Sequence, residues 1–260
     1  VFDKGTSLED ALDNMFEKAQ EAYENGYTIL VLSDRSVSAD KIAIPSLLAV
    51  SAMHQYLVQK GTRTSVGLVI ESGEPREVHH FATLIGFGAA AVNPYMAYEA
   101  IRGLREEGLL ELDYDTAVYN YNKAVLKGIT KILSKMGIST IQSYMGAQIF
   151  EAIGIGKDVI DRYFTNTVSR IGGIGLEEIQ KEAEIKHENG FKDKTYAADF
   201  ILDSPGYEKL RSGDGIQEQH LYNPTTIHKL QEATRTGNYE LFKEYTNLID
   251  DEEAEITLPS

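Results

Sequence analysis

Short apolar segments alternate with longer amphipathic segments through the first half of the chain. Residues 28–32 (TILVL) are apolar and rich in β-branched side chains, a pattern typical of a strand that is buried on both faces. Helical spacing of apolar residues over 8–23 predicts a helix before this strand. Short strands separated by helices indicate βαβ units and a parallel sheet. Further strands are predicted over 65–70 and 89–92, and further helices over 45–60, 74–85 and 95–107.

The second half of the chain continues this alternation and then changes character. Residues 191–219 are rich in Asp, Gly and Lys with little periodicity, which predicts an irregular loop. We therefore expect a central α/β domain over residues 1–190 and a connecting arm of loop and helices over 191–260. The elements predicted in this half are helices over 115–135 and 147–152, a strand over 139–142, a helix after the glycine-rich segment 172–175, and helices over 225–231 and 239–248.

The number of predicted strands limits the fold. Four or five parallel strands are too few to close an eight-stranded (β/α) barrel. The pattern therefore predicts an α/β fold with an incomplete, barrel-like parallel sheet, flanking helices and a C-terminal helical arm. An open doubly wound sheet fits the same order of elements and stays open as the alternative.

The charge balance and the composition exclude several classes of function. Lys and Arg total 25 against 40 Asp and Glu, which gives a formal net charge of -15. Nucleic acids and anionic membranes need a concentrated positive surface, so we expect neither as a partner. No apolar run is long enough to span a bilayer, and no secretory signal opens the chain. The absence of cysteine excludes thiolate nucleophiles and cysteine-ligated iron–sulfur clusters, and it fits a cytoplasmic protein.

Polar residues at the ends of the predicted strands are the candidates for a site, because α/β proteins bind ligands at the carboxyl ends of parallel strands. Arg35 and Glu71 follow the first two strands, Gln142 ends the strand predicted over 139–142, and Arg170 precedes the glycine-rich segment. Glu71 has the chemistry of a general base or of a carboxylate anchor, or it forms an ion pair with a neighbouring arginine. A ligand held by Arg35, Glu71 and Arg170 together would make the chain a self-contained domain that binds a small acid or anion.

Three other motifs are weaker candidates. His79 and His80 are adjacent, so on a helix they point about 100° apart and do not bind one metal ion as an i, i+4 pair would. The glycines in 172–175 suit a phosphate cradle at a helix start, but a tight turn explains them better. Ser143 lacks both a base placed by the sequence and a G-x-S-x-G motif. The sequence therefore predicts no catalytic residue, no cofactor-binding residue and no metal ligand.

Four long segments, in the same order, resemble the central domain of the glutamate synthase large subunit. They cover most of the chain, and the last of them is similar to the segment that leads toward the FMN domain in that family. The chain begins at Val1 rather than at Met, which also favours a segment of a longer polypeptide. The four segments are VGLVIESGEPREVHHFATLIGFGAAAVNP (66–94), SKMGISTIQSYMGAQIFEAIG (134–154), TVSRIGGIGLEEI (167–179) and HLYNPTTIHKLQEATRTGNYELFKEY (220–245).

The resemblance implies a role without chemistry of its own. In this family an amidotransferase domain with an N-terminal cysteine releases ammonia from glutamine. A later (β/α) barrel with FMN and an iron–sulfur cluster reduces the adduct of ammonia with 2-oxoglutarate. The expected partners of this chain are therefore those two domains of the same polypeptide and, where the electron donor is a nicotinamide cofactor, a small electron-donating subunit. We expect no cofactor in this segment, and we expect a noncatalytic connecting domain that is inactive in isolation.

Overall fold

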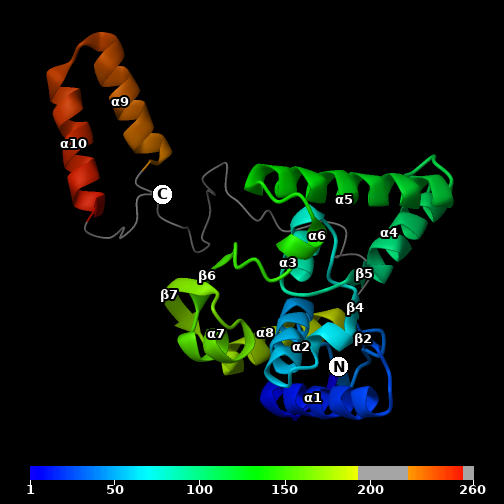
Figure 1. Cartoon of the computed structure of the whole chain (residues 1–260). Helices are drawn as coiled ribbons and strands as arrows, with labels where there is room; N and C mark the ends of the chain where they lie inside the picture. Colours follow the sequence, from blue (N-terminus) through cyan, green and yellow to red (C-terminus); the bar gives the residue numbers. More distant parts are fainter. Residues whose placement is uncertain (193–221, 254–260) are drawn as a thin grey trace. The chain divides into compact units, whose positions relative to one another are not determined.

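Contacts between residues in the computed structural model divide the chain into two units, Val1–Lys192 and Asp193–Ser260. The structure describes residues 1–192 and 222–253 (Figure 1). The irregular loop predicted over 191–219 lies almost entirely outside the described residues. Both helices predicted after it are confirmed, as α9 (Pro224–Thr236) and α10 (Tyr239–Glu253). Whether the chain also divides functionally at residue 190 stays a prediction.

Three parallel strands form the main sheet of the first unit, in the order β2 (Ile29–Ser33), β4 (Gly67–Glu71) and β5 (Ala91–Asn93). The helices α2 (Ser46–Gln59) and α3 (Val78–Gly86) connect them, so the predicted βαβ units are confirmed. The register places Ser33 beside Glu71, and Glu71 beside Asn93. The carboxyl ends of all three strands therefore lie at one level.

Within the residues that the structure describes, helices cover only one face of the main sheet. Leu30 and Leu68 face helix α1 (Leu8–Glu24) and helix α2, where they pack against Met53 and Ala19 in a buried cluster. Successive residues of a strand point to opposite faces. The other face of β2 is accordingly exposed, so the prediction of a strand buried on both faces is wrong. The exposed fractions there are 63% for Ile29 and 57% for Val31.

A second, separate sheet contains the parallel strands β6 (Glu151–Ile155) and β7 (Val168–Ile174), connected by α7 (Lys157–Tyr163). The helix predicted over 147–152 is wrong, because the β-branched residues that follow it pair as a strand. Two glycines allow this pairing. Gly154 has a φ of +77°, and a Cβ on Gly173 would lie 2.1 Å from the Gly154 carbonyl oxygen.

The strand predicted over 139–142 is also wrong, because this segment forms the short helix α6 (Ile141–Tyr144). Its one fully buried side chain is Tyr144, which meets the ring of Phe150 edge-on with 6.2 Å between the ring centroids. A single buried anchor fits a helical turn, whereas a central strand would need an apolar face along its length. The predicted helices before this segment are confirmed as α4 (Tyr95–Glu106) and α5 (Tyr114–Met136).

Helix packing joins the two sheets into one unit. The Ser51 hydroxyl of α2 donates to the Tyr163 carbonyl at the end of α7, over 2.5 Å in the core. Helix α8 (Leu176–Phe191) returns to the start of α1, where the Gln180 side chain accepts from the Leu8 amide. The unit also contains the 3-10 helix η1 (Arg63–Ser65) and a two-residue antiparallel pair, β1 (Phe2–Asp3) with β3 (Lys41–Ile42).

The strands in residues 1–192 and 222–253 form no closed barrel, since they lie in separate sheets. The structure thus confirms an α/β fold with parallel sheets and flanking helices, of the incomplete-barrel or open type. None of the helices in this described part is both long enough and apolar enough to cross a membrane.

Candidate functional site

Glu71 lies at the centre of the strand ends and is fully engaged by its neighbours. Its carboxylate accepts hydrogen bonds from the Ser33 hydroxyl at 2.7 Å and from the Asn93 amide at 3.0 Å. The Arg35 guanidinium forms an ion pair with it, with 2.8 Å between Nε and Oε1. The bond from Ser33, followed by that from Arg35, lowers the pKa of Glu71 below its ordinary value. A carboxylate with a lowered pKa is a weak base, so the geometry favours the ion pair with Arg35 over general-base chemistry.

Asp34 forms a second network beside the first. Its carboxylate accepts from the Ser72 hydroxyl at 2.6 Å, from the Gly73 amide at 3.0 Å and from the Tyr95 hydroxyl at 2.7 Å. Burial, followed by the bond to Asp34, raises the pKa of Tyr95 to about 12, so this phenol stays protonated and donates. The Arg35 guanidinium lies 4.3 Å from the centroid of the Tyr95 ring and connects the two networks. Together they hold the ends of β2, β4 and the start of α4 in fixed positions.

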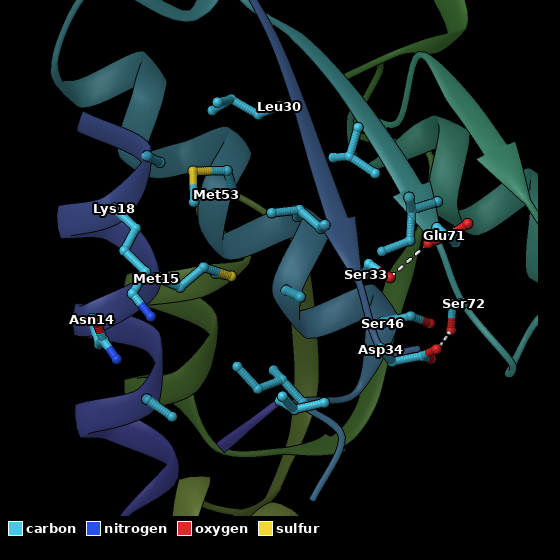
Figure 2. A pocket seen from close by; sticks show the side chains of 18 residues that line it. Asn14, Met15, Lys18, Leu30, Ser33, Asp34, Ser46, Met53, Glu71 and Ser72 are labelled. Atoms are coloured by element: carbon cyan, nitrogen blue, oxygen red, sulfur yellow. Dashed lines mark hydrogen bonds between the residues drawn. The ribbon is translucent and has the colours of Figure 1, made fainter. Parts of the chain in front are cut away.

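A cavity of about 350 Å³ opens behind these networks, between α1, β2 and α2 (Figure 2). Its inner wall is apolar and includes Leu30 and Met53. Asn14 and Lys18, one turn apart on α1, also line it, as does Ser33. Figure 2 shows the bonds from Ser33 to Glu71 and from Ser72 to Asp34 among the lining residues. The polar groups on the sheet side are therefore used to hold the strand ends, and the cavity lacks a nucleophile paired with a base.

The four candidate residues do not meet at one rim. Arg35 and Glu71 are in contact, but Gln142 is an exposed residue of α6 and does not end a strand. Arg170 lies inside β7 rather than at its end, is 77% exposed, and is 3.5 Å from Glu151 on the neighbouring strand. The four candidates did not include Asp34 and its partner Tyr95, which form the second network. The matched ends of β2, β4 and β5 would have been the signal, because each strand is followed by polar residues.

Local hydrogen bonds account for two of the other sequence motifs, the glycine-rich segment and the histidine pair. At the start of α8 the Gly175 amide donates to the Glu178 carboxylate at 2.7 Å, so an acidic side chain already lies where a phosphate would bind. His79 and His80 are both exposed, and His80 Nδ1 accepts from the Arg76 amide at 3.0 Å.

A metal site would draw on the acidic residues and histidines of this chain. In the part of the chain that the structure describes, His, Asp and Glu form no group of three that could hold a metal ion. The chain contains no cysteine, so an iron–sulfur cluster does not fit its residues.

Fold and site together define the class of this protein, an α/β domain of the incomplete-barrel or open type whose strand-end carboxylates bind neighbouring groups of the same chain. The sequence model of the glutamate synthase central domain matches residues 1–156. The chain belongs to the glutamate synthase central domain family, as the resemblance in four of its segments predicted.

Relatives extend the similarity over nearly the whole chain. The glutamate synthase [NADPH] large chain of Bacillus subtilis is 49% identical over 246 residues, which is 94% of this chain and 16% of the relative. The glutamate synthase [NADH] of Schizosaccharomyces pombe is 41% identical over 91% of this chain and 11% of the relative. The ferredoxin-dependent glutamate synthase of Cyanidium caldarium is 38% identical over 94% of this chain and 16% of the relative. The chain thus spans less than a fifth of the length of the relatives it matches.

Proposed function

We propose that this chain is the noncatalytic central connecting domain of a glutamate synthase. It holds the glutamine amidotransferase domain and the FMN-binding domain in position, so that glutamate forms from glutamine and 2-oxoglutarate. Residues 1–190 form the connecting α/β domain, and residues 191–260 form an arm that leads toward the FMN domain. The family match supports this assignment, as does the small share of each relative that the chain spans.

The observation that carries the proposal is that, in the described part of the chain, both parallel sheets have an exposed apolar face. On the main sheet this face includes Ile29 and Val31, which are 63% and 57% exposed. On the second sheet the paired residues Ile153 and Ile171 are 74% and 63% exposed. Fully burying one such side chain contributes about 1.5–3 kcal/mol. Exposed apolar surface in contiguous strands is a typical mark of an interface.

Neighbouring domains of the same polypeptide are the partners that fit these faces. They account for most of the length of each relative, and they are covalently linked to this domain. Ammonia released at one active site is useful only if it reaches the next. A rigid connector that packs against both domains fixes their relative position, which a flexible linker does not do.

The chemistry of the parent enzyme lies outside this chain. FMN, the iron–sulfur cluster and the electron donor belong to the other domains or subunits of a cytoplasmic oxidoreductase. The names of the relatives include NADPH, NADH and ferredoxin forms, so this domain serves enzymes with different donors. A small electron-donating subunit is a partner of the parent only in the nicotinamide-dependent forms.

The test changes the bare faces in the full-length polypeptide. Val31→Lys and Ile153→Lys each place a charge on one face, and the glutamate formed per glutamine hydrolysed should fall in both variants. Leu109→Lys is the matched control, because Leu109 is 71% exposed in the turn between α4 and α5, away from both sheets. Full coupling in both face variants would show that the sheets do not position the two active sites, and the connecting role would then be wrong.

A further inference from the structure

A second cavity, of about 220 Å³, lies where four separate segments meet in the first unit. The segments are α2, the end of α3, the residues before β6 and the residues before β7. None of the residues that line the cavity is Asp, Glu, Lys or Arg, although the chain has a net charge of -15. The lining instead combines the rings of Phe87 and Phe150 with an imidazole and several amide side chains. A neutral lining in an acidic protein leaves this cavity open to an anion.

The imidazole of His54 is held in one orientation and one tautomer. Arg63 Nε donates to His54 Nδ1 over 2.9 Å. Because Nδ1 accepts, the neutral ring carries its proton on Nε2. Gly88 makes room for this arrangement, since it has a φ of +121° and a Cβ there would lie 2.5 Å from Nδ1. Arg63 and Gly88 thus lie against the Nδ1 edge of the ring, and Nε2–H is available to donate to a ligand.

Arg63 adds positive charge behind the imidazole. Its two terminal nitrogens donate to the carbonyls of Val66 and Gly88, at 2.6 and 2.9 Å. Among the described residues no carboxylate forms an ion pair with Arg63. Burial, followed by the charge of Arg63, lowers the pKa of His54 to about 4, so the ring is neutral near pH 7. An anion next to Nε2 would therefore face a donor that a positive charge polarises.

Backbone strain points to the same cavity. In residues 1–192 and 222–253, Gln148 and Asn166 are the two non-glycine residues with positive φ, at 53° and 65°. Both line this cavity, from different segments. Glycine adopts these conformations without strain, and asparagine adopts them more readily than most other residues do, so Gln148 is the more strained of the two. Backbone strain of this kind gathers at binding sites.

We propose that this cavity binds a small organic carboxylate. The carboxylate accepts hydrogen bonds from His54 Nε2–H and from the side-chain amides of Gln148 and Asn166. The rings of Phe87 and Phe150 contact the apolar part of the ligand. This site is separate from the network around Asp34 and Glu71 and goes beyond the connecting function.

The binding test uses three probes on the chain of 260 residues, by isothermal titration calorimetry at pH 7. Benzoate combines a carboxylate with an apolar ring, benzamide has the same shape without the charge, and inorganic phosphate has the charge without the ring. We expect benzoate to bind at millimolar concentration or below, and benzamide to bind at least about tenfold more weakly. Equal binding of benzoate and benzamide, tighter binding of phosphate, or no binding of benzoate would each overturn the proposal.

Glycine variants separate binding from folding. Gln148→Gly and Asn166→Gly keep the backbone conformation, so the Tm should not fall by more than a few degrees. Each should weaken benzoate binding about tenfold, because one hydrogen bond to a charged group is lost. Lys18→Ala, in the cavity beside α1, is the control and should bind benzoate as the parent does. Folded glycine variants with unchanged benzoate affinity would contradict the assignment.

An independent readout comes from the imidazole itself. Bound carboxylate near Nε2 stabilises the protonated ring, so the pKa of His54, followed by NMR, should rise when benzoate is added. An unchanged pKa of His54 at saturating benzoate would place the ligand elsewhere.

Discussion

The two faces of the main sheet are formed by the same three strands, yet they differ in what they touch. On one face Leu30 and Leu68 are packed under α1 and α2. On the other face the two neighbours of Leu30 in sequence, Ile29 and Val31, are more than half exposed. Both sets of side chains are apolar and β2 itself is regular, so neither local propensity nor hydrophobicity distinguishes them. The difference shows that one face stabilises the fold, whereas the exposed face is the one for which we propose a neighbouring domain as the cover.

The largest effect is expected on the covered face. Leu68 is completely buried, so Leu68→Ala should lower the free energy of unfolding by about 2–5 kcal/mol through lost burial and a residual cavity. Urea denaturation of the isolated chain measures this. Val69→Ala is the matched control, because Val69 is the next residue of β4 and faces the opposite side. Equal losses in the two variants would contradict the distinction between the faces.

The second largest loss of stability is expected at the carboxyl ends of the strands, where the Asp34 network lies. Asp34→Ala removes the acceptor of three hydrogen bonds and leaves the Gly73 amide and the Tyr95 hydroxyl without their partner. We expect a loss of about 1–3 kcal/mol in the free energy of unfolding. Glu111→Ala, an exposed acidic residue before α5, should change it by less than about 0.5 kcal/mol. A loss in Asp34→Ala no larger than in this control would show that the network does not stabilise the fold.

Elements that depend on neighbouring residues could be predicted from the sequence, whereas elements that depend on contacts between distant residues could not. The strands β2, β4 and β5 were predictable because each is a short apolar run followed by polar residues, and the pairing of Arg35 with Glu71 was one of the stated alternatives. Strand β6 was missed because its pairing depends on the backbone contact between Gly154 and Gly173, far apart in the chain. No local signal marks such a contact.

The apolar run over 28–32 was misread for a more informative reason. Its residues have the composition of a strand that is covered on both sides, and only the structure shows that, within residues 1–192 and 222–253, one face of this strand is exposed. The cavity lined by His54 could not be predicted from the sequence. A histidine on a helix, a glutamine and an asparagine in loops become a cluster only through the fold, and positive φ at non-glycine residues cannot be read from their identity.

Helix α2, one of the two helices that cover the main sheet, contains His54, which makes a pH-dependent contribution to stability. The pKa of His54 falls from 6.5 to about 4 on folding, so between these values the unfolded chain binds more protons. Stability from the neutral ring is therefore fully present above about pH 6.5 and is lost as the pH falls toward 4. Allowing for the ring edge that faces the cavity, we expect about 1–2 kcal/mol. Denaturation curves across this pH range measure it. His54→Gln should have a flatter profile than the parent chain, and identical profiles would contradict the lowered pKa.

The smallest effect on the isolated chain is expected on the bare face, and it completes the comparison. Val31→Thr keeps a β-branched side chain on β2 and replaces a methyl group that is already in water. The free energy of unfolding should change by less than about 0.5 kcal/mol in urea denaturation. Leu30→Thr, one residue earlier on the same strand, buries a hydroxyl and should cost several times more. If Val31→Thr destabilises the isolated chain as much as Leu30→Thr does, then both faces serve the fold of this chain. A small loss in isolation, with weakened coupling when Val31 is changed in the full polypeptide, would mean that the apolar side chain is needed only where a neighbouring domain covers it.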